Sequence, residues 1–328
     1  MTDRHSTSGT AAAVAVPSGP APGGLSAPRT PSGPRSRRGR RSRWPGPAFI
    51  APHMLALGLF MLLPTGYAIY MSLYTTRLVG GTHYSGLANY GTVLSSPEFW
   101  DGVRRVLLFA VIQVPLTLAL AFFFAAIFDA GVVRFNRFFR TVFFMPFAVP
   151  GVVAAVMWSF LLLPGFGPYS RVLAGLGLGH VDFFSSNLIL PTIVLIVLWE
   201  WTGYNMTILY TSLKSIPREI TEAAVVSGAS LTTIILRLKL PMVRPTLVML
   251  VFLNTVGALQ LFTEPSILEA FQPQAISFGF TPTLYVYNTA IGSGEYNLGA
   301  AAAVVLAVII GLISLAAFAV RRRHGEFR

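Results

Sequence analysis

The 328-residue chain contains no cysteine, which excludes disulfides, thiolate metal sites and cysteine nucleophiles. It is also poor in charge. Charged residues make up only 11% of it, whereas a soluble domain has about a quarter. Hydrophobic residues make up 54%, and the mean hydropathy is +0.65. A water-soluble fold of this length cannot bury that much apolar surface, so the composition predicts a polytopic membrane protein.

Sequence motifs of common enzymes are absent as well. The chain has no glycine-rich nucleotide loop, no H-E-x-x-H and no G-x-S-x-G. Its hydrophobic spans hold no pair of Asp residues for an aspartyl site, and we interpret their single histidine, His53, as structural. We therefore predict no enzymatic activity, no catalytic residue and no metal site for this chain.

The N-terminal segment, residues 1–44, is rich in Ser, Pro, Gly, Ala and Arg and has almost no large apolar residue. Such a segment cannot bury enough surface to offset its chain entropy, so we predict a disordered basic tail. Its arginine run at 35–43 would also suit a twin-arginine export signal. The long apolar stretch that follows has no small-residue cleavage site, which favours a cytoplasmic anchor instead.

Six apolar spans make up most of residues 45–328, which we predict to form one all-α transmembrane domain. Each span is long enough to cross a hydrocarbon core of ~30 Å, which takes about 20 helical residues. Backbone groups in lipid must pair internally, which favours helices. We expect prolines such as Pro146 and Pro150 to bend or bound them. The expected spans are 48–74, 105–128, 141–163, 188–211, 246–266 and 298–320.

Basic residues orient these spans. If the N-terminus is inside, 20 of the 24 Lys and Arg residues fall in cytoplasmic segments, as the positive-inside rule requires. Both termini and the segment 213–245 are then cytoplasmic. The net charge of +12 would suggest nucleic acid in a soluble protein. Here it indicates contact with anionic membrane lipid, and we expect no nucleic acid as a partner.

The segment 213–245, between the fourth and fifth spans, is polar and basic. Ser215 followed by Pro217 predicts a helix start, and Gly228 predicts a sharp turn with positive φ. Ser230 or Thr232 would cap a second helix, which we expect to end before Pro241. Two short helices held to a membrane-embedded body at both ends suit the transfer of force to a soluble partner.

This segment resembles the EAA loop of bacterial ABC importer permeases: E-A-A, three residues, G, nine residues and I-x-L-P. Ser227 stands where an Asp commonly precedes the glycine, which leaves the ATPase pairing in doubt, and Leu238 replaces the usual Ile. The resemblance covers about residues 45–320 and is closest to the carbohydrate, maltose/oligosaccharide-type branch, on 143–167, 257–273 and 296–306. The residues that match the loop pattern are Glu222, Ala223, Ala224, Gly228, Leu240 and Pro241.

The resemblance implies the function and the partners of the chain. It implies a multi-pass permease subunit of a sugar importer in the bacterial plasma membrane, paired with a second, non-identical permease. The segment 213–245 would form coupling helices that dock on a cytoplasmic ABC ATPase dimer. That ATPase would bind ATP and Mg, so no cofactor is expected on this chain. An extracytoplasmic solute-binding protein would deliver the substrate.

Polar residues in the fourth and fifth spans are candidates for the substrate pathway, because polar groups inside a membrane are expensive. Planar amides and carboxylates suit sugar hydroxyls, and aromatic rings suit the C–H face of a sugar. The same amides also suit simple helix packing, which is how we interpret Gln113. The candidates are Glu200, Trp201, Tyr204, Asn205, Asn254 and Gln260.

Two alternatives remain open at this point. A polyol or glycerol phosphate permease would need Arg or Lys in the pathway. None of the six spans has an Arg or Lys in its interior. A secondary transporter or channel belongs to a different class, and we would expect it to show inverted repeats and paired intramembrane charges. We find no obvious internal repeat, and Glu200 is the one charge well inside a span.

The topology generates a first prediction. Single cysteines at His180 and Ser230 should react oppositely with an impermeant thiol reagent in intact cells, because the charge bias places position 180 outside and position 230 inside. The chain has no native cysteine, so the unsubstituted protein is the blank. Labelling at 230 without labelling at 180 would overturn the six-span topology.

Overall fold

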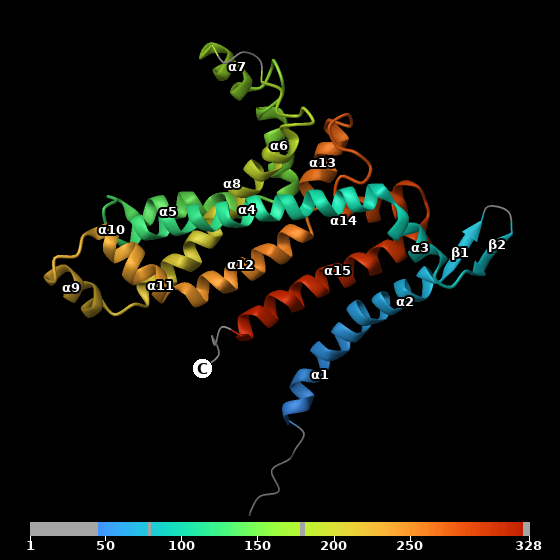
Figure 1. Cartoon of the computed structure of the whole chain (residues 1–328), viewed down its shortest axis with the longest axis horizontal. Coiled ribbons are helices and arrows are strands. Elements are labelled where there is room, and N and C mark those ends of the chain that lie inside the picture. Colours follow the sequence, from blue (N-terminus) through green and yellow to red (C-terminus); the bar gives the residue numbers. More distant parts are fainter. Residues whose placement is uncertain (1–44, 78–79, 178–180, 324–328) are drawn as a thin grey trace, which may run out of the picture. The chain divides into compact units, whose positions relative to one another are not determined.

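A computed structural model describes residues 45–77, 80–177 and 181–323. The chain divides into two compact units, residues 1–54 and 55–328. The predicted disordered tail, 1–44, lies outside the described residues. Helix α1 (Pro45–Leu57) leads through a π-helical turn, Gly58–Leu62, into α2 (Leu63–Ser72) (Figure 1).

A small β-hairpin follows α2, so the prediction of an all-α fold is wrong at this point. Strands β1 (Tyr74–Arg77) and β2 (Gly81–Tyr84) pair antiparallel. Threonine and tyrosine favour strands. Gly80, before β2, and Gly81, its first residue, have positive φ of 111° and 70°, which glycine adopts freely. The Oγ1 atoms of Thr76 and Thr82 lie 2.9 Å apart across the hairpin.

The rest of the described chain is mostly helical and carries the predicted spans. Five helical stretches are long and apolar enough to cross a membrane, and a bent pair makes a sixth. Further helical pieces lie between α8 and α12. The other helices are α3 (Ala88–Ser95), α4 (Pro97–Asp129), α5 (Asn136–Phe144), the 3-10 helix η2 (Met145–Ala148), α6 (Gly151–Leu161), α7 (Pro168–Gly175), α8 (Ile189–Lys214), α12 (Arg244–Leu259), α13 (Thr263–Phe271), α14 (Pro282–Tyr287), the π-helix η4 (Asn288–Gly292) and α15 (Tyr296–Arg323).

The third predicted span, 141–163, is not one straight helix. The stretch Asn136–Ala148 and helix α6 meet at an angle of 97°. Pro150 explains the break. It has no N–H to continue the ladder, and the residue before a proline is driven toward extended backbone. Pro146 lies within the first limb, and Met145 before it stays helical at φ −53° and ψ −41°. Val149, before Pro150, is extended at φ −78° and ψ 126°.

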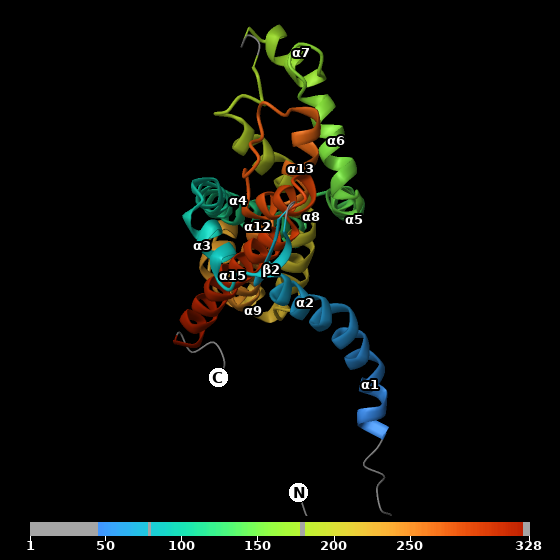
Figure 2. The same cartoon turned by 90° about the vertical axis from the view of Figure 1, so that its right-hand side faces the viewer.

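Helix α8 lies at the centre of the larger unit. It packs along α4 and also contacts α5, η2 and α12 (Figure 1). Its buried side chains, such as Ile193, Met206 and Leu209, join the main hydrophobic core. Helix α15 packs against α2, α3 and α14, and α13 lies beside α6 (Figure 2).

Gly203 allows the closest contact in this packing. A Cβ at this position would overlap the carbonyl oxygen of Phe143, so only glycine leaves room for the bent segment against α8. We predict that Gly203→Ala lowers the yield of folded protein, because overpacking costs about 1–3 kcal/mol or more.

The matched control is Gly311→Ala in α15, where a Cβ would meet nothing within 4 Å. Purified yield and thermal stability in detergent check the prediction. Equal stability of the two variants would contradict it.

Candidate functional site

A cavity of about 340 Å³ lies among α4, α8, α12 and the start of α13. Four of the six predicted pathway residues line it: Trp201, Tyr204, Asn254 and Gln260. The remaining wall is largely apolar, with Phe109, Leu250 and Phe262 among its members. Helices α8 and α12 therefore bring predicted residues from two spans to one surface.

The other two predicted residues, Glu200 and Asn205, are not among the lining residues of this cavity. The Glu200 side chain is buried behind it. Asn205 is fully buried, and its Nδ2 donates to the Trp201 carbonyl oxygen at 2.9 Å. Both residues, predicted as pathway candidates together with Tyr204, are therefore buried and lie off the cavity surface.

Asn205 and Asn254 join two helices by a pair of amide hydrogen bonds. Nδ2 of Asn254 donates to Oδ1 of Asn205 at 2.8 Å, and Nδ2 of Asn205 donates to Oδ1 of Asn254 at 3.3 Å. Such bonds contribute roughly 0.6 kcal/mol each inside membrane proteins. Asn254 thus has two roles in the structure, since it lines the cavity and holds α12 against α8.

Two rings that line the cavity, Trp201 and Tyr204, pack against a third ring, Phe147, which is not among the lining residues. Phe147 stacks on Tyr204 with ring centroids 4.5 Å apart, and Trp201 meets both rings edge-on. Phe147 belongs to η2, so the bend before α6 is what delivers it to α8. The sequence offered no sign of this contact, because Phe147 is one of several phenylalanines in an apolar stretch.

Further polar residues line the cavity beyond those predicted, among them Gln113 and Glu264. Gln113, interpreted from sequence as helix packing, donates to Thr117 Oγ1 at 2.8 Å and also faces the cavity. Glu264 lines it as well, and its carboxyl group lies close to that of Glu200, near Gly151. The spacing of Glu264, four residues after Gln260, was the available signal. None of the lining residues, all of them in the described part of the chain, is Arg or Lys.

The segment 213–245 forms the predicted turn between helical pieces. Helix α9 (Arg218–Val226) is followed by Ser227, its C-cap, and then by Gly228, which has φ 79°. The amide of Ala229 donates to the Ala224 carbonyl at 3.0 Å, and that of Gly228 to the Val225 carbonyl at 2.9 Å. These two bonds close the helix as a Schellman motif, which needs the left-handed conformation that glycine adopts freely.

The second half of the segment is one helical run with a wide turn. It comprises α10 (Leu231–Thr233), the π-helix η3 (Ile234–Lys239) and α11 (Leu240–Met242). Ser230 caps it, as predicted, by accepting from the Thr233 amide at 3.3 Å. The prediction that the helix ends before Pro241 is wrong. The π turn covers Arg237, whose carbonyl the proline ring would meet in an α-helix.

The predicted N-cap of the first helix is also wrong. Ser215 ends α8 as its C-cap, and its hydroxyl donates back to the Ser212 carbonyl. Pro217 takes the N-cap position of α9, without a side-chain cap. The matched loop residues lie on the outside of the segment: Glu222, Ala223, Gly228 and Pro241 are exposed, and Ala224 and Leu240 are half-buried.

Comparison with known proteins decides the family. Residues 113–324 match the family model described as binding-protein-dependent transport system inner membrane component. The chain belongs to this family. It is an inner membrane component of an ABC transporter, a transport permease rather than a nucleotide-hydrolysing subunit.

Curated relatives span nearly the same length as this permease. The sn-glycerol-3-phosphate transport system permease protein UgpA of Salmonella choleraesuis is 29% identical, over 85% of this chain and 94% of the relative. The lactose transport system permease protein LacF of Rhizobium radiobacter is 28% identical, over 84% and 93%. A probable ABC transporter permease protein of Pyrococcus horikoshii is 30% identical, over 81% and 92%.

A solved structure shares the fold. A chain of the bacterial ABC transporter involved in the import of the acidic polysaccharide alginate superposes with a TM-score of 0.75 at 20% sequence identity. The match covers 85% of this chain and 95% of that one. It supports the overall fold of the permease.

The cavity generates a prediction that separates lining from packing. Tyr204→Ala and Asn254→Ala should change uptake rate or solute preference several-fold, because a hydrogen bond is worth about 0.5–1.5 kcal/mol net. The complexes should still assemble and hydrolyse ATP. Asn205→Ala, the packing control, should lower complex yield and leave solute preference unchanged.

Uptake assays with complex yields from the same cells check this prediction. If the Tyr204 and Asn254 variants show only reduced yield, with normal transport by the complexes that remain, both residues serve helix packing and the cavity is not the pathway.

Proposed function

We propose that this permease, with a second and non-identical permease subunit, forms the path by which a sugar enters a bacterial cell. The observation that carries the proposal is the cavity between α8 and α12. It combines stacked aromatic rings with amide side chains and a carboxyl group. Aromatic rings pack on sugar C–H faces, and amides bond the hydroxyls.

The charge of the cavity favours a neutral solute over a phosphate ester. The relatives include a glycerol-phosphate permease and a lactose permease by name, so sequence identity alone does not choose between them. A phosphate group is normally met by Arg or Lys. The cavity presents Glu264 and no basic residue among its described lining, and a buried carboxyl group beside a phosphate is unfavourable.

The segment 213–245 is the proposed contact with a cytoplasmic ABC ATPase dimer, which would bind ATP and Mg. Its helix α9 has no buried residue, and Val225 and Val226 are strongly exposed. Exposed apolar side chains on a compact, capped helix suit a docking contact. An extracytoplasmic solute-binding protein would deliver the sugar; a neighbouring fold was solved together with such a protein.

The experiment combines uptake with copurification. Cells that express the whole transporter should take up lactose or maltose in preference to sn-glycerol 3-phosphate and to alginate oligosaccharides, and the ATPase should copurify with the permease. Gly228→Leu should abolish uptake while the protein still inserts, because a bulky residue at φ 79° is strained and would misplace α9.

The matched control is Gly131→Leu. Gly131 also has positive φ, at 72°, but it lies outside the segment 213–245. Its variant should retain more uptake than Gly228→Leu at equal expression. Normal uptake by a well-expressed Gly228→Leu protein would contradict the coupling role, and uptake of sn-glycerol 3-phosphate alone would contradict the sugar assignment.

A further inference from the structure

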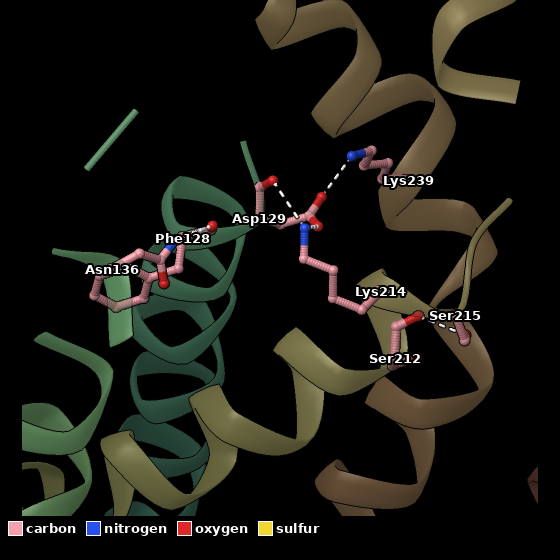
Figure 3. A network of polar contacts seen from close by, with 7 residues as sticks. All are labelled: Phe128, Asp129, Asn136, Ser212, Lys214, Ser215 and Lys239. Atoms are coloured by element: carbon pink, nitrogen blue, oxygen red, sulfur yellow. Dashed lines mark hydrogen bonds and ion pairs between the residues drawn. The ribbon is translucent and has the colours of Figure 1, made fainter. Parts of the chain in front are cut away.

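Asp129, the last residue of α4, holds two lysines from other parts of the chain. Its Oδ1 lies 3.0 Å from Nζ of Lys214, the last residue of α8. Its Oδ2 lies 2.5 Å from Nζ of Lys239, the last residue of the π-helix η3. Figure 3 shows the carboxylate between the two ammonium groups. One side chain therefore connects two spans and the second half of the segment 213–245.

The burial of Asp129 and Lys239 distinguishes their contact from a surface ion pair. The Asp129 side chain is 5% exposed and that of Lys239 is 13% exposed, whereas that of Lys214 is 47% exposed. A different ion pair joins Asp101 to Arg104, one helical turn later in α4, and both of these side chains are largely exposed. Exposed pairs contribute little, whereas breaking a buried pair is strongly unfavourable. The Asp129 contacts are thus expected to persist while the elements move.

The end of α4 needs this positive charge. Asp129 lies at a helix C-terminus, where the helix dipole is negative and an acid is disfavoured. Lys214 also donates to the Asp129 carbonyl oxygen at 3.4 Å, and Asn136 donates to that of Phe128 at 2.6 Å (Figure 3). These donors satisfy carbonyls that a helix end leaves unpaired. An acid retained at an unfavourable position, with two lysines turned toward it, points to a role beyond helix capping.

We propose that Asp129 is a positioning residue that joins the second half of the segment 213–245 rigidly to α4 and α8. Movement of this segment then reaches both helices at once. Each of them carries cavity residues further along, Phe109 and Gln113 on α4 and Trp201 and Tyr204 on α8. Packed helices that move together as one rigid body commonly transmit a conformational change of this kind. The inference rests on the proposed coupling function of 213–245.

The main test uses a reporter cysteine in the cavity. Gly257→Cys is suitable because Gly257 lines the cavity and a Cβ there meets nothing within 4 Å. The chain has no native cysteine. The probe is an impermeant methanethiosulfonate reagent, applied to cells that express the whole transporter. The readout is the ratio of labelling rates in ATP-replete and ATP-depleted cells.

Lys239→Met is the decisive variant, because Asp129 keeps Lys214 as a partner and the buried charge stays paired. The ATP-dependent change in labelling should largely disappear in Lys239→Met, at equal expression and with the ATPase still copurifying. Lys239→Arg, which keeps the pair, should restore it. Asp101→Asn, which removes the exposed pair at the other end of α4, is the matched control and should leave it unchanged. A full ATP-dependent change in the labelling rate of Lys239→Met would contradict the proposed positioning role of Asp129.

A second measurement separates failure of the positioning role from failure of the proposed function. Amide hydrogen exchange over residues 234–243 of the purified full chain should be faster in Lys239→Met than in the parent, and restored in Lys239→Arg. If the parent reporter shows no ATP-dependent change in labelling, the proposed coupling function is contradicted. Amide hydrogen exchange then tests the connection between Asp129 and Lys239 by itself. Equal exchange in the parent and Lys239→Met would overturn it.

Discussion

The contact of α8 with the bent segment α5–η2 is the one on which the rest of the structure depends. At Gly203 the two backbones meet with no space for a Cβ. This approach places Phe147 of η2 on Tyr204 of α8, and Tyr204 lines the cavity. The same helix carries Asn205, which holds α12. A permease whose α8 moved away from these neighbours would lose its cavity wall and its interhelical bonds together.

Much of the fold could be predicted because its signals are local. Long apolar runs mark spans wherever they occur. The first predicted span matches the run from α1 through α2, and the others match α4, α8, α12 and α15 to within several residues at most ends. Gly228 and Ser230 behaved as predicted, because turns and caps depend on a few neighbouring residues. Pro146 and Pro150 were expected to bend or bound helices, but their direction of bending depends on what the chain packs against.

The candidate site was harder to predict because its contacts join distant parts of the chain. Glu200 and Asn205 were predicted together with Tyr204 as polar or aromatic candidates of one span, yet the cavity includes only Tyr204 of the three. Which face of α8 is open depends on α4 and α12, and no pattern within α8 records that. Gln113, Phe147 and Glu264 were missed for the same reason. Asp129 directly follows a predicted span, and the sequence gives no sign that the fold places Lys214 and Lys239 beside it.

The bend between η2 and α6 has a consequence for the lipid around the permease. Helix α6 has 11 residues, which span about 17 Å at 1.5 Å per residue. The stretch Asn136–Ala148 is of similar length, so neither limb alone matches a hydrocarbon thickness of about 30 Å. A bilayer against this side would have to thin to the length of the limbs. Hydrophobic mismatch therefore makes another protein surface, rather than lipid, the favourable neighbour of this side.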